Sequence, residues 1–198
     1  AVTIDPATGA VRGYFGGDDP NGWDYANSPL QTGSTFKIMA LAAALQQGIE
    51  LETNYSSAPY QLPGSQTVNN VGGGCGSCSI AEALKNSYNT SFLRLQDDLE
   101  NKMQDTADMA HALGVARSLP GIEKTLTENG GTPFEGVVLG QYQSRPLDMA
   151  TAMATLTNQG VWHQPHFVEK VENAAGEVLY ENPTDAGERR VSANVANN

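Results

Sequence analysis

The chain has 198 residues, enough for one domain with a substantial hydrophobic core. Its 11 basic and 22 acidic residues give a net charge of −11, which argues against nucleic acid or an anionic membrane as the main partner. The longest uninterrupted apolar run, Ile38 to Leu45, is too short to cross a bilayer. No basic segment followed by an apolar one opens the chain, so we expect any export signal or anchor to lie outside this sequence.

Two short runs with β propensity open the sequence. Residues 2–4 and 11–15 flank the segment 5–9, whose Pro and Gly predict a hairpin turn. After Gly33, apolar residues recur with helical spacing until Gly48 ends the pattern: Ile38, Leu41, Ala42 and Leu45. Residues 49–78 show little periodicity and are expected to form an irregular excursion.

Capping residues predict the helices of the middle of the chain. Ser79 and Glu82 form a capping box for a helix that begins near Ile80. Asn89 is the expected N-cap of a second helix through Leu95. The segment Ser87-Tyr88-Asn89 is therefore expected to form a short corner between two helices.

The last third of the chain returns to strands. We expect a helix over residues 105–113, and Pro146 predicts the start of another that ends at Gly160. Residues 167–171 and 177–180 then predict a second hairpin. A strand pair, a helical middle and a second strand pair together predict an α+β fold.

The tetrapeptide Ser34-Thr35-Phe36-Lys37 points to nucleophilic catalysis. Residues three apart lie on one face of a helix, so the amine of Lys37 can reach the hydroxyl of Ser34 and take its proton. Free N–H groups at the helix start favour negative charge that develops on Ser34. A lysine acts as a base only if its pKa is lowered, and the apolar helix face provides the burial that lowers it. By itself, the spacing also fits a helix-capping serine followed by a surface lysine.

A second polar pair, Ser87 and Asn89, lies on the expected corner between the two helices. Its hydroxyl could relay a proton and its carboxamide could bind a peptide group of a substrate. Ordinary helix capping by Asn89 is the alternative. The same S-x-N spacing recurs at Ser192 and Asn194, so the spacing alone does not choose between the two places.

Cysteine and histidine spacings raise the question of a metal site. Cys75 and Cys78 lie in a glycine-rich loop, and their spacing allows a local disulfide, a redox centre or half of a zinc site. The chain has only two cysteines, which excludes a four-cysteine site. His163 and His166 have a metal-like spacing but flank Pro165 just after a helix, so we expect a solvated loop there and no metal.

The motifs resemble those of a known family. The segments 25–27 and 31–37, with the apolar helix after them, are similar to the first motif of the transpeptidase domain of bifunctional class A penicillin-binding proteins. Residues 87–92 resemble the second motif, with Tyr88 where the general pattern has Asp. The resemblance continues through residues 140–142, 146–150 and 165–168 and covers essentially the whole chain, with most detail shared with actinobacterial members.

The resemblance implies a role for each site residue. Ser34 is then the acylated nucleophile, Lys37 its base and Ser87 a proton relay, while Asn89 binds the substrate amide and Lys37. It also implies the penicillin-binding-protein and serine β-lactamase-like fold, a five-stranded antiparallel sheet flanked by helices with a helical subdomain. No cofactor is expected. Because the family is exported, a disulfide between Cys75 and Cys78 is favoured over free thiols.

The family's third motif, Lys-Thr-Gly on a strand, does not occur at its expected place. Lys124-Thr125-Leu126 begins like it but lacks the glycine, and we reject it. We therefore expect residues 1–198 to be the N-terminal part of one transpeptidase domain, with the C-terminal part that carries Lys-Thr-Gly as its partner. The expected division is 1–17 for sheet strands, 18–162 for the nucleophile helix and helical subdomain, 163–182 for a hairpin and 183–198 for the start of the C-terminal part.

The function that the resemblance implies is a penicillin-sensitive serine D,D-transpeptidase. It would cross-link peptidoglycan stem peptides through an acyl-enzyme on Ser34, and β-lactams would acylate the same residue. The alternatives are a β-lactamase or D,D-carboxypeptidase on the same fold, a non-catalytic sensor of β-lactams or muropeptides, and a structural fragment. The resemblance also implies a place at the extracytoplasmic face of the cell membrane, with an N-terminal anchor outside this sequence.

Overall fold

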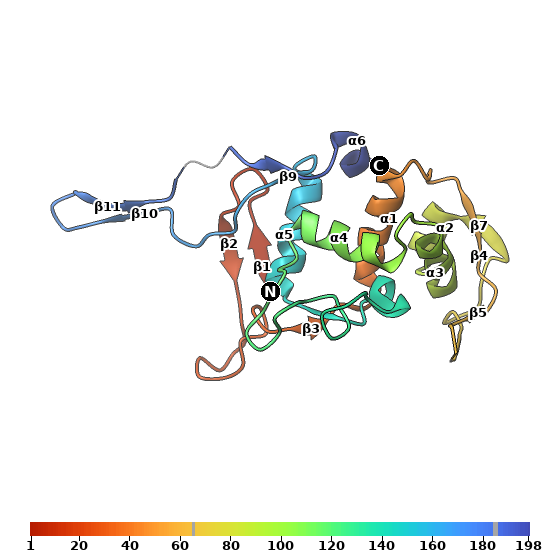
Figure 1. Cartoon of the computed structure of the whole chain (residues 1–198). Helices are drawn as coiled ribbons and strands as arrows, with labels where there is room; N and C mark the ends of the chain where they lie inside the picture. Colours follow the sequence, from red (N-terminus) through yellow and green to blue (C-terminus); the bar gives the residue numbers. More distant parts are fainter. Residues whose placement is uncertain (65, 184–185) are drawn as a thin grey trace. The chain divides into compact units, whose positions relative to one another are not determined.

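The computed structural model describes residues 1–64, 66–183 and 186–198. Ser65, in the expected excursion, and Thr184 and Asp185, in the expected C-terminal segment, therefore lie outside the described residues. The chain, whose elements are drawn in Figure 1, divides into two compact units. Unit 1 consists of Ala1–Pro29, Ala112–Val115 and Arg145–Asn197, and unit 2 of Leu30–His111, Ala116–Ser144 and Asn198.

Unit 1 holds short strand pairs and two helices. Its elements are β1 (Val2–Ile4), β2 (Val11–Tyr14), α5 (Pro146–Thr157), β9 (Val161–Trp162), β10 (Lys170–Glu172), β11 (Val178–Glu181), β12 (Glu188–Arg189) and α6 (Ala193–Asn197). The expected first hairpin is confirmed, because β1 pairs antiparallel with β2. Its turn closes where the N–H of Gly9, at a φ of 79°, donates to the carbonyl of Asp5 at 2.9 Å.

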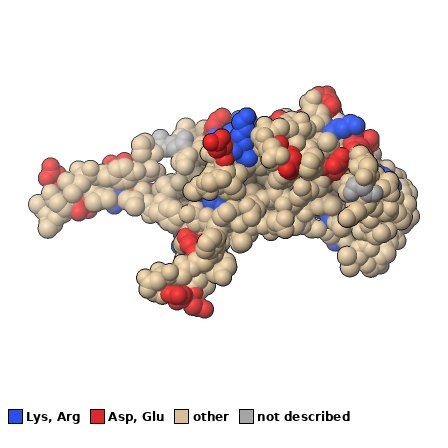
Figure 2. Space-filling model, turned by 60° about the horizontal axis from the view of Figure 1, so that its bottom comes forward, with Lys and Arg blue, Asp and Glu red and all other residues tan. Residues whose placement is uncertain are grey.

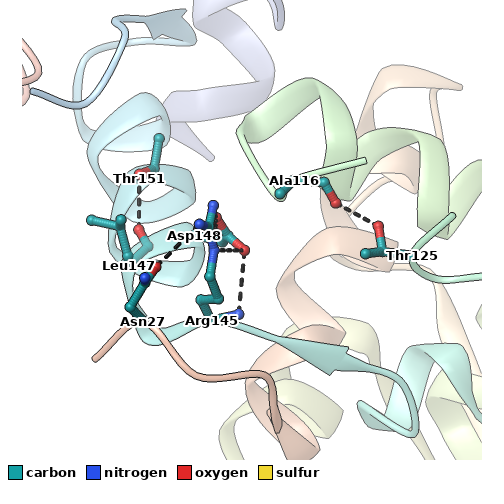
Figure 3. A network of polar contacts seen from close by, with 7 residues as sticks. All are labelled: Asn27, Ala116, Thr125, Arg145, Leu147, Asp148 and Thr151. Atoms are coloured by element: carbon teal, nitrogen blue, oxygen red, sulfur yellow. Dashed lines mark hydrogen bonds and ion pairs between the residues drawn. The ribbon is translucent and has the colours of Figure 1, made fainter. Parts of the chain in front are cut away.

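Helix α5 begins as the sequence predicts, at Pro146, and ends at Thr157, three residues before the expected stop. An ion pair between the buried Asp148 and the partly buried Arg145 closes its N-terminus: the guanidinium of Arg145 donates to Asp148 at 2.6 Å, and the same side chain donates to Asn27 at 3.1 Å (Figure 3). The Asp148 carboxylate also accepts from the Arg145 backbone N–H at 3.2 Å, which is the carboxylate half of a capping box. A carboxylate in the first helical turn also suits the positive end of the helix dipole.

The C-terminal strands partly match the expectation. The second hairpin forms between β10 and β11, shifted by one to three residues from the predicted runs. The expectation of a solvated loop around the histidines is wrong for His163, which is 8% exposed. The imidazole ring packs closely against Gly187, since a Cβ on that glycine would lie 2.7 Å from the Nε2 of His163. No cluster of three His, Cys, Asp or Glu side chains that could hold a metal occurs among the described residues.

Unit 2 is mainly helical. Its elements are β3 (Leu30–Gln31), the 3₁₀-helix η1 (Gly33–Phe36), α1 (Lys37–Gln46), β4 (Asn54–Ser56), β5 (Tyr60–Gln61), β6 (Thr67–Val68), β7 (Ser77–Ser79), α2 (Ile80–Lys85), α3 (Asn89–Asp97), α4 (Met103–Leu113, whose last two residues fall in unit 1), the 3₁₀-helix η2 (Glu135–Leu139) and β8 (Gln143–Ser144). Helices α1 and α3 pack against each other in its core, and Met39 on α1 and Phe92 and Leu95 on α3 are fully buried. Burial of such side chains contributes about 1.5–3 kcal/mol each.

The expected irregular excursion over residues 49–78 is wrong in part. Its described residues hold four short strands, the last of which continues to Ser79; β4 pairs with β7 and β5 with β6, both antiparallel. The pairs are two or three residues long, so they leave almost no period-two pattern in the sequence. Of the capping predictions, Ser79 is confirmed, since its hydroxyl accepts from the Glu82 N–H at 3.2 Å.

Every sheet among the described residues has two strands, so the five-stranded sheet that the resemblance implied is not assembled from them. No described helix combines the length and apolar character needed to span a bilayer. On the face that Figure 2 shows, basic and acidic side chains lie in small groups between broad uncharged areas. That described face therefore offers no extended basic surface for a polyanion.

Candidate active site

Ser34 and Lys37 lie at the junction of η1 and α1. The sequence predicts one continuous helix, whereas the structure has a 3₁₀ turn over Gly33–Phe36 and an α-helix from Lys37. The Nζ of Lys37 lies 2.8 Å from the Oγ of Ser34. Ser34 is exposed while Lys37 is fully buried, so the hydroxyl is open to a substrate and the amine approaches it from inside the protein.

The corner at Ser87 has an unusual backbone. Helix α2 ends in a Schellman motif, in which the Tyr88 N–H donates to the Ala83 carbonyl at 2.9 Å and the Ser87 N–H to the Leu84 carbonyl at 3.0 Å. This motif needs a left-handed residue, usually glycine, at the position after the cap, and Ser87 holds it with a φ of 57°. The left-handed turn presents both the carbonyl oxygen and the hydroxyl of Ser87 to Lys37, each at 2.9 Å.

Four oxygens surround the amine of Lys37. Besides the hydroxyl of Ser34 and the two oxygens of Ser87, the Oδ1 of Asn89 lies 2.6 Å from Nζ. The two carbonyl oxygens can only accept, whereas the two hydroxyls can accept or donate. A neutral amine can therefore donate its two hydrogens to the carbonyls of Ser87 and Asn89 and use its lone pair to accept from a hydroxyl. The arrangement suits an amine that takes a proton from Ser34.

Burial also prepares Lys37 to act as a base. Its four oxygen partners carry no formal charge, and the ring of Phe92 lies 5.9 Å from Nζ. Burial lowers the pKa of Lys37 to about 8, because an ammonium group removed from water loses its hydration and is disfavoured. With that pKa, about a tenth of the amine is neutral at pH 7, far more than at the ordinary lysine value.

The backbone just before Ser34 is fixed by residues 140–144. Strand β3 pairs with β8, and the Nε2 of Gln31 donates to the carbonyl of Gln141 at 2.9 Å. Gly140, at a φ of 71°, packs so closely on Gly33 that a Cβ would lie 2.3 Å from the backbone N and O of Gly33. Sequence reasoning gave Gly140 no role, because its contact with Gly33 spans more than a hundred residues.

The two rejected or rival motifs have structural roles of their own. Ser192 accepts the Val195 N–H at 3.2 Å, an ordinary cap of α6. Lys124-Thr125-Leu126 lies in turns rather than in a strand, with Thr125 buried and donating to the carbonyl of Ala116 (Figure 3). Of the two S-x-N pairs, the one that contacts Lys37 is Ser87 and Asn89. The structure joins Cys75 to Cys78, the middle residue of β7, in a disulfide.

Comparison with known proteins gives matches over the full chain. The family described as the penicillin binding protein transpeptidase domain matches residues 1–198. Penicillin-binding protein 1A of Mycolicibacterium smegmatis is 56% identical over 200 residues, covering all of this chain and 26% of that protein. Peptidoglycan D,D-transpeptidase PbpA of the same organism is 33% identical over 83% of this chain and 36% of its own length.

A solved structure shares the fold closely. PonA1 from Mycobacterium tuberculosis, in complex with penicillin V, superposes with a TM-score of 0.95 and 52% identity, covering all of this chain and 52% of that one. The chain thus spans only part of each relative that it matches. The full-length family match, the shared fold and the motif residues gathered around Lys37 lead to one conclusion: this chain belongs to the penicillin-binding protein transpeptidase domain family.

Proposed function

We propose that this chain contributes the nucleophile of a penicillin-sensitive D,D-transpeptidase, with Ser34 forming the acyl-enzyme. The observation that carries the proposal is the buried amine of Lys37, 2.8 Å from the exposed hydroxyl of Ser34 and lowered in pKa to about 8. A serine hydroxyl is a weak nucleophile until a neighbouring base accepts its proton. Lys37 is a base of the right strength at the right distance.

The proposed first half-reaction acylates Ser34. The lone pair of Lys37 takes the hydroxyl proton as the Ser34 Oγ bonds to the carbonyl carbon of the penultimate D-Ala of a stem peptide. The bond to the terminal D-Ala then breaks, and its amine receives a proton from Lys37 through the hydroxyl of Ser87. A β-lactam reacts in the same way, except that the broken amide bond lies in its ring, so the leaving amine stays attached.

The proposed second half-reaction forms the cross-link. The amine of another stem peptide loses a proton to the Lys37–Ser87 pair and attacks the acyl carbon. Ser34 leaves and regains its proton, which returns the site to its starting state. The carboxamide of Asn89 still has its NH₂ group available, because only its Oδ1 is held by Lys37, and that group donates to a substrate amide.

The relatives support this substrate class. One matched structure holds penicillin V, and one matched relative is named a peptidoglycan D,D-transpeptidase. Because the chain covers about a quarter to a half of these relatives, the activity of the whole protein remains part of the proposal. Two further points belong to the proposal. The partner of this chain is the segment that carries the Lys-Thr-Gly motif, and the protein lies at the extracytoplasmic face of the membrane, where stem peptides occur.

Labelling of the full-length protein with a penicillin tests the proposal. Mass spectrometry of the wild type is expected to show one adduct, on the peptide that contains Ser34, and Ser34→Ala is expected to show none. An adduct that persists in Ser34→Ala would refute the assignment. Incubation with a pentapeptide stem and an amine acceptor then separates the alternatives: a transpeptidase forms the cross-linked product, a carboxypeptidase only releases D-Ala, and a sensor does neither.

A further inference from the structure

The N-terminus of α3 lacks the cap that its own sequence suggests. The first N–H groups of a helix have no partner within it and need acceptors from outside. The residue before α3, Tyr88, makes no capping bond with its side chain. Asn89, the N-cap expected from the sequence, is instead the first helical residue, and its Oδ1 accepts from Lys37 at 2.6 Å. A side chain that holds Lys37 is not available to cap the helix.

Asn70 supplies the missing cap from outside the helix. Its Oδ1 accepts from the backbone N–H of Thr90 at 3.0 Å, which is the bond that an N-cap side chain makes. Its Nδ2 donates to the Oγ1 of Thr90 and to the carbonyl of Ser57, both at 2.9 Å. Thr90 is fully buried, so no water replaces these bonds. These three bonds need one acceptor and two donor hydrogens on one short side chain, which is what the carboxamide of Asn70 provides.

The segment that carries Asn70 is itself held to its neighbours. The carbonyl of Ser57, which Asn70 contacts, belongs to a residue that is 7% exposed. The N–H of Ser57 donates to the carbonyl of Gly76 at 2.9 Å, inside the loop closed by the disulfide between Cys75 and Cys78. Asn70 therefore connects the start of α3 to a braced loop rather than to a free one.

We propose that Asn70 is a positioning residue for the reaction at Ser34: by capping α3 in place of Asn89, it leaves the Asn89 carboxamide free to hold Lys37. The proposal rests on the proposed function. Two arrangements compete at this helix end. In one, Asn89 acts as the N-cap that the sequence predicts and gives up Lys37; in the other, Asn70 caps and Asn89 holds Lys37. The structure shows the second, and the bonds of Asn70 favour it.

The test measures how fast a fluorescent penicillin acylates the full-length protein at several penicillin concentrations. These rates give two constants: the dissociation constant of the noncovalent penicillin complex and the rate constant of acylation within it. The variants are Asn70→Ala, Asn89→Ala and the double variant. Asn70→Asp keeps the oxygen that caps the helix, and aspartate is a good N-cap. Asn69→Ala, at the exposed neighbouring position, is the matched control. Asn70→Leu, close to asparagine in size, replaces Asn70→Ala should the alanine variant not fold.

We expect Asn70→Ala to lower the acylation rate constant by about 10- to 100-fold, the effect of misplacing a catalytic group by about 1 Å. The dissociation constant is expected to stay within about twofold, as is the rate of Asn69→Ala. At the pH plateau, Asn70→Asp is expected to fall between the wild type and Asn70→Ala, because it keeps the capping oxygen but loses the donor to the Ser57 carbonyl. The double variant is expected to be no slower than Asn89→Ala by more than about twofold, because Asn70 acts through Asn89.

Several results would overturn the inference. A wild-type acylation rate in Asn70→Ala, or in Asn70→Leu where the alanine variant does not fold, excludes the capping role. Multiplied losses in the double variant show that Asn70 acts independently of Asn89. Failure of the proposed function looks different, since the wild type and Asn69→Ala would then form no adduct on Ser34.

Discussion

The left-handed backbone at Ser87 allows its hydroxyl and its conformation to be tested separately. Ser87 occupies the glycine position of a Schellman motif with a φ of 57°, and its hydroxyl lies 2.9 Å from the Nζ of Lys37. Two substitutions remove the hydroxyl, but they differ in backbone preference. Ser87→Gly accepts the left-handed conformation without strain, whereas Ser87→Ala keeps the Cβ that opposes it.

The expected difference in stability between Ser87→Gly and Ser87→Ala follows from the left-handed backbone at residue 87. A non-glycine residue in the left-handed region costs about 1 kcal/mol relative to glycine, after allowing for the greater freedom of glycine in the unfolded chain. We therefore expect Ser87→Gly to be more stable than Ser87→Ala by about 1 kcal/mol. In a cooperative unit of 150–250 residues, that corresponds to about 2–4 °C in melting temperature, and a larger unit shows a smaller shift. Both variants lose the same hydroxyl, so both should be acylated by penicillin ~10²-fold more slowly than the wild type.

Thermal melts and penicillin acylation rates of the two variants, made in the full-length protein and measured at the same pH, provide the test. Equal melting temperatures would show that the corner does not impose a left-handed residue. A Ser87→Gly protein that acylates at the wild-type rate would show that the hydroxyl carries no proton, and the role of Ser87 would be withdrawn.

Three further predictions concern the surroundings of the site. Because burial lowers the pKa of Lys37 to about 8 and the neutral amine is the base, the acylation rate should rise with pH and level off above about 8; a flat profile from about pH 6 to 9 contradicts this. Gly140→Ala should slow acylation ~10-fold or more, because its Cβ would lie 2.3 Å from the backbone of Gly33, the residue before the nucleophile. Gly121 has a similar left-handed backbone but open space around it, so Gly121→Ala should leave the acylation rate unchanged. Arg145→Ala should lower the free energy of unfolding by about 3 kcal/mol in denaturant melts, since it leaves the Asp148 carboxylate, 2% exposed, without its cation; a loss no larger than that of a surface substitution contradicts this.

Local patterns accounted for most of the helices and for the first hairpin. The apolar spacing after Gly33, the capping box at Ser79 and the proline at 146 each act over less than two helical turns, so the sequence alone predicts their effects. The short strand pairs within residues 54–79 were missed, because pairs of two or three residues are selected by what they pack against rather than by their own pattern.

The sequence by itself determined that Ser34 and Lys37 lie on one face of a helical turn, because residues three apart do so, and the structure brings their side chains to 2.8 Å. It did not determine which S-x-N pair would meet them, or that Asn89 would leave its capping role to Asn70. Those outcomes depend on contacts across 20 to 52 residues. Such contacts form only when packing of α1 against α3 offsets the entropy of closing the loops between them. The tertiary structure therefore decided which polar side chains surround the amine of Lys37.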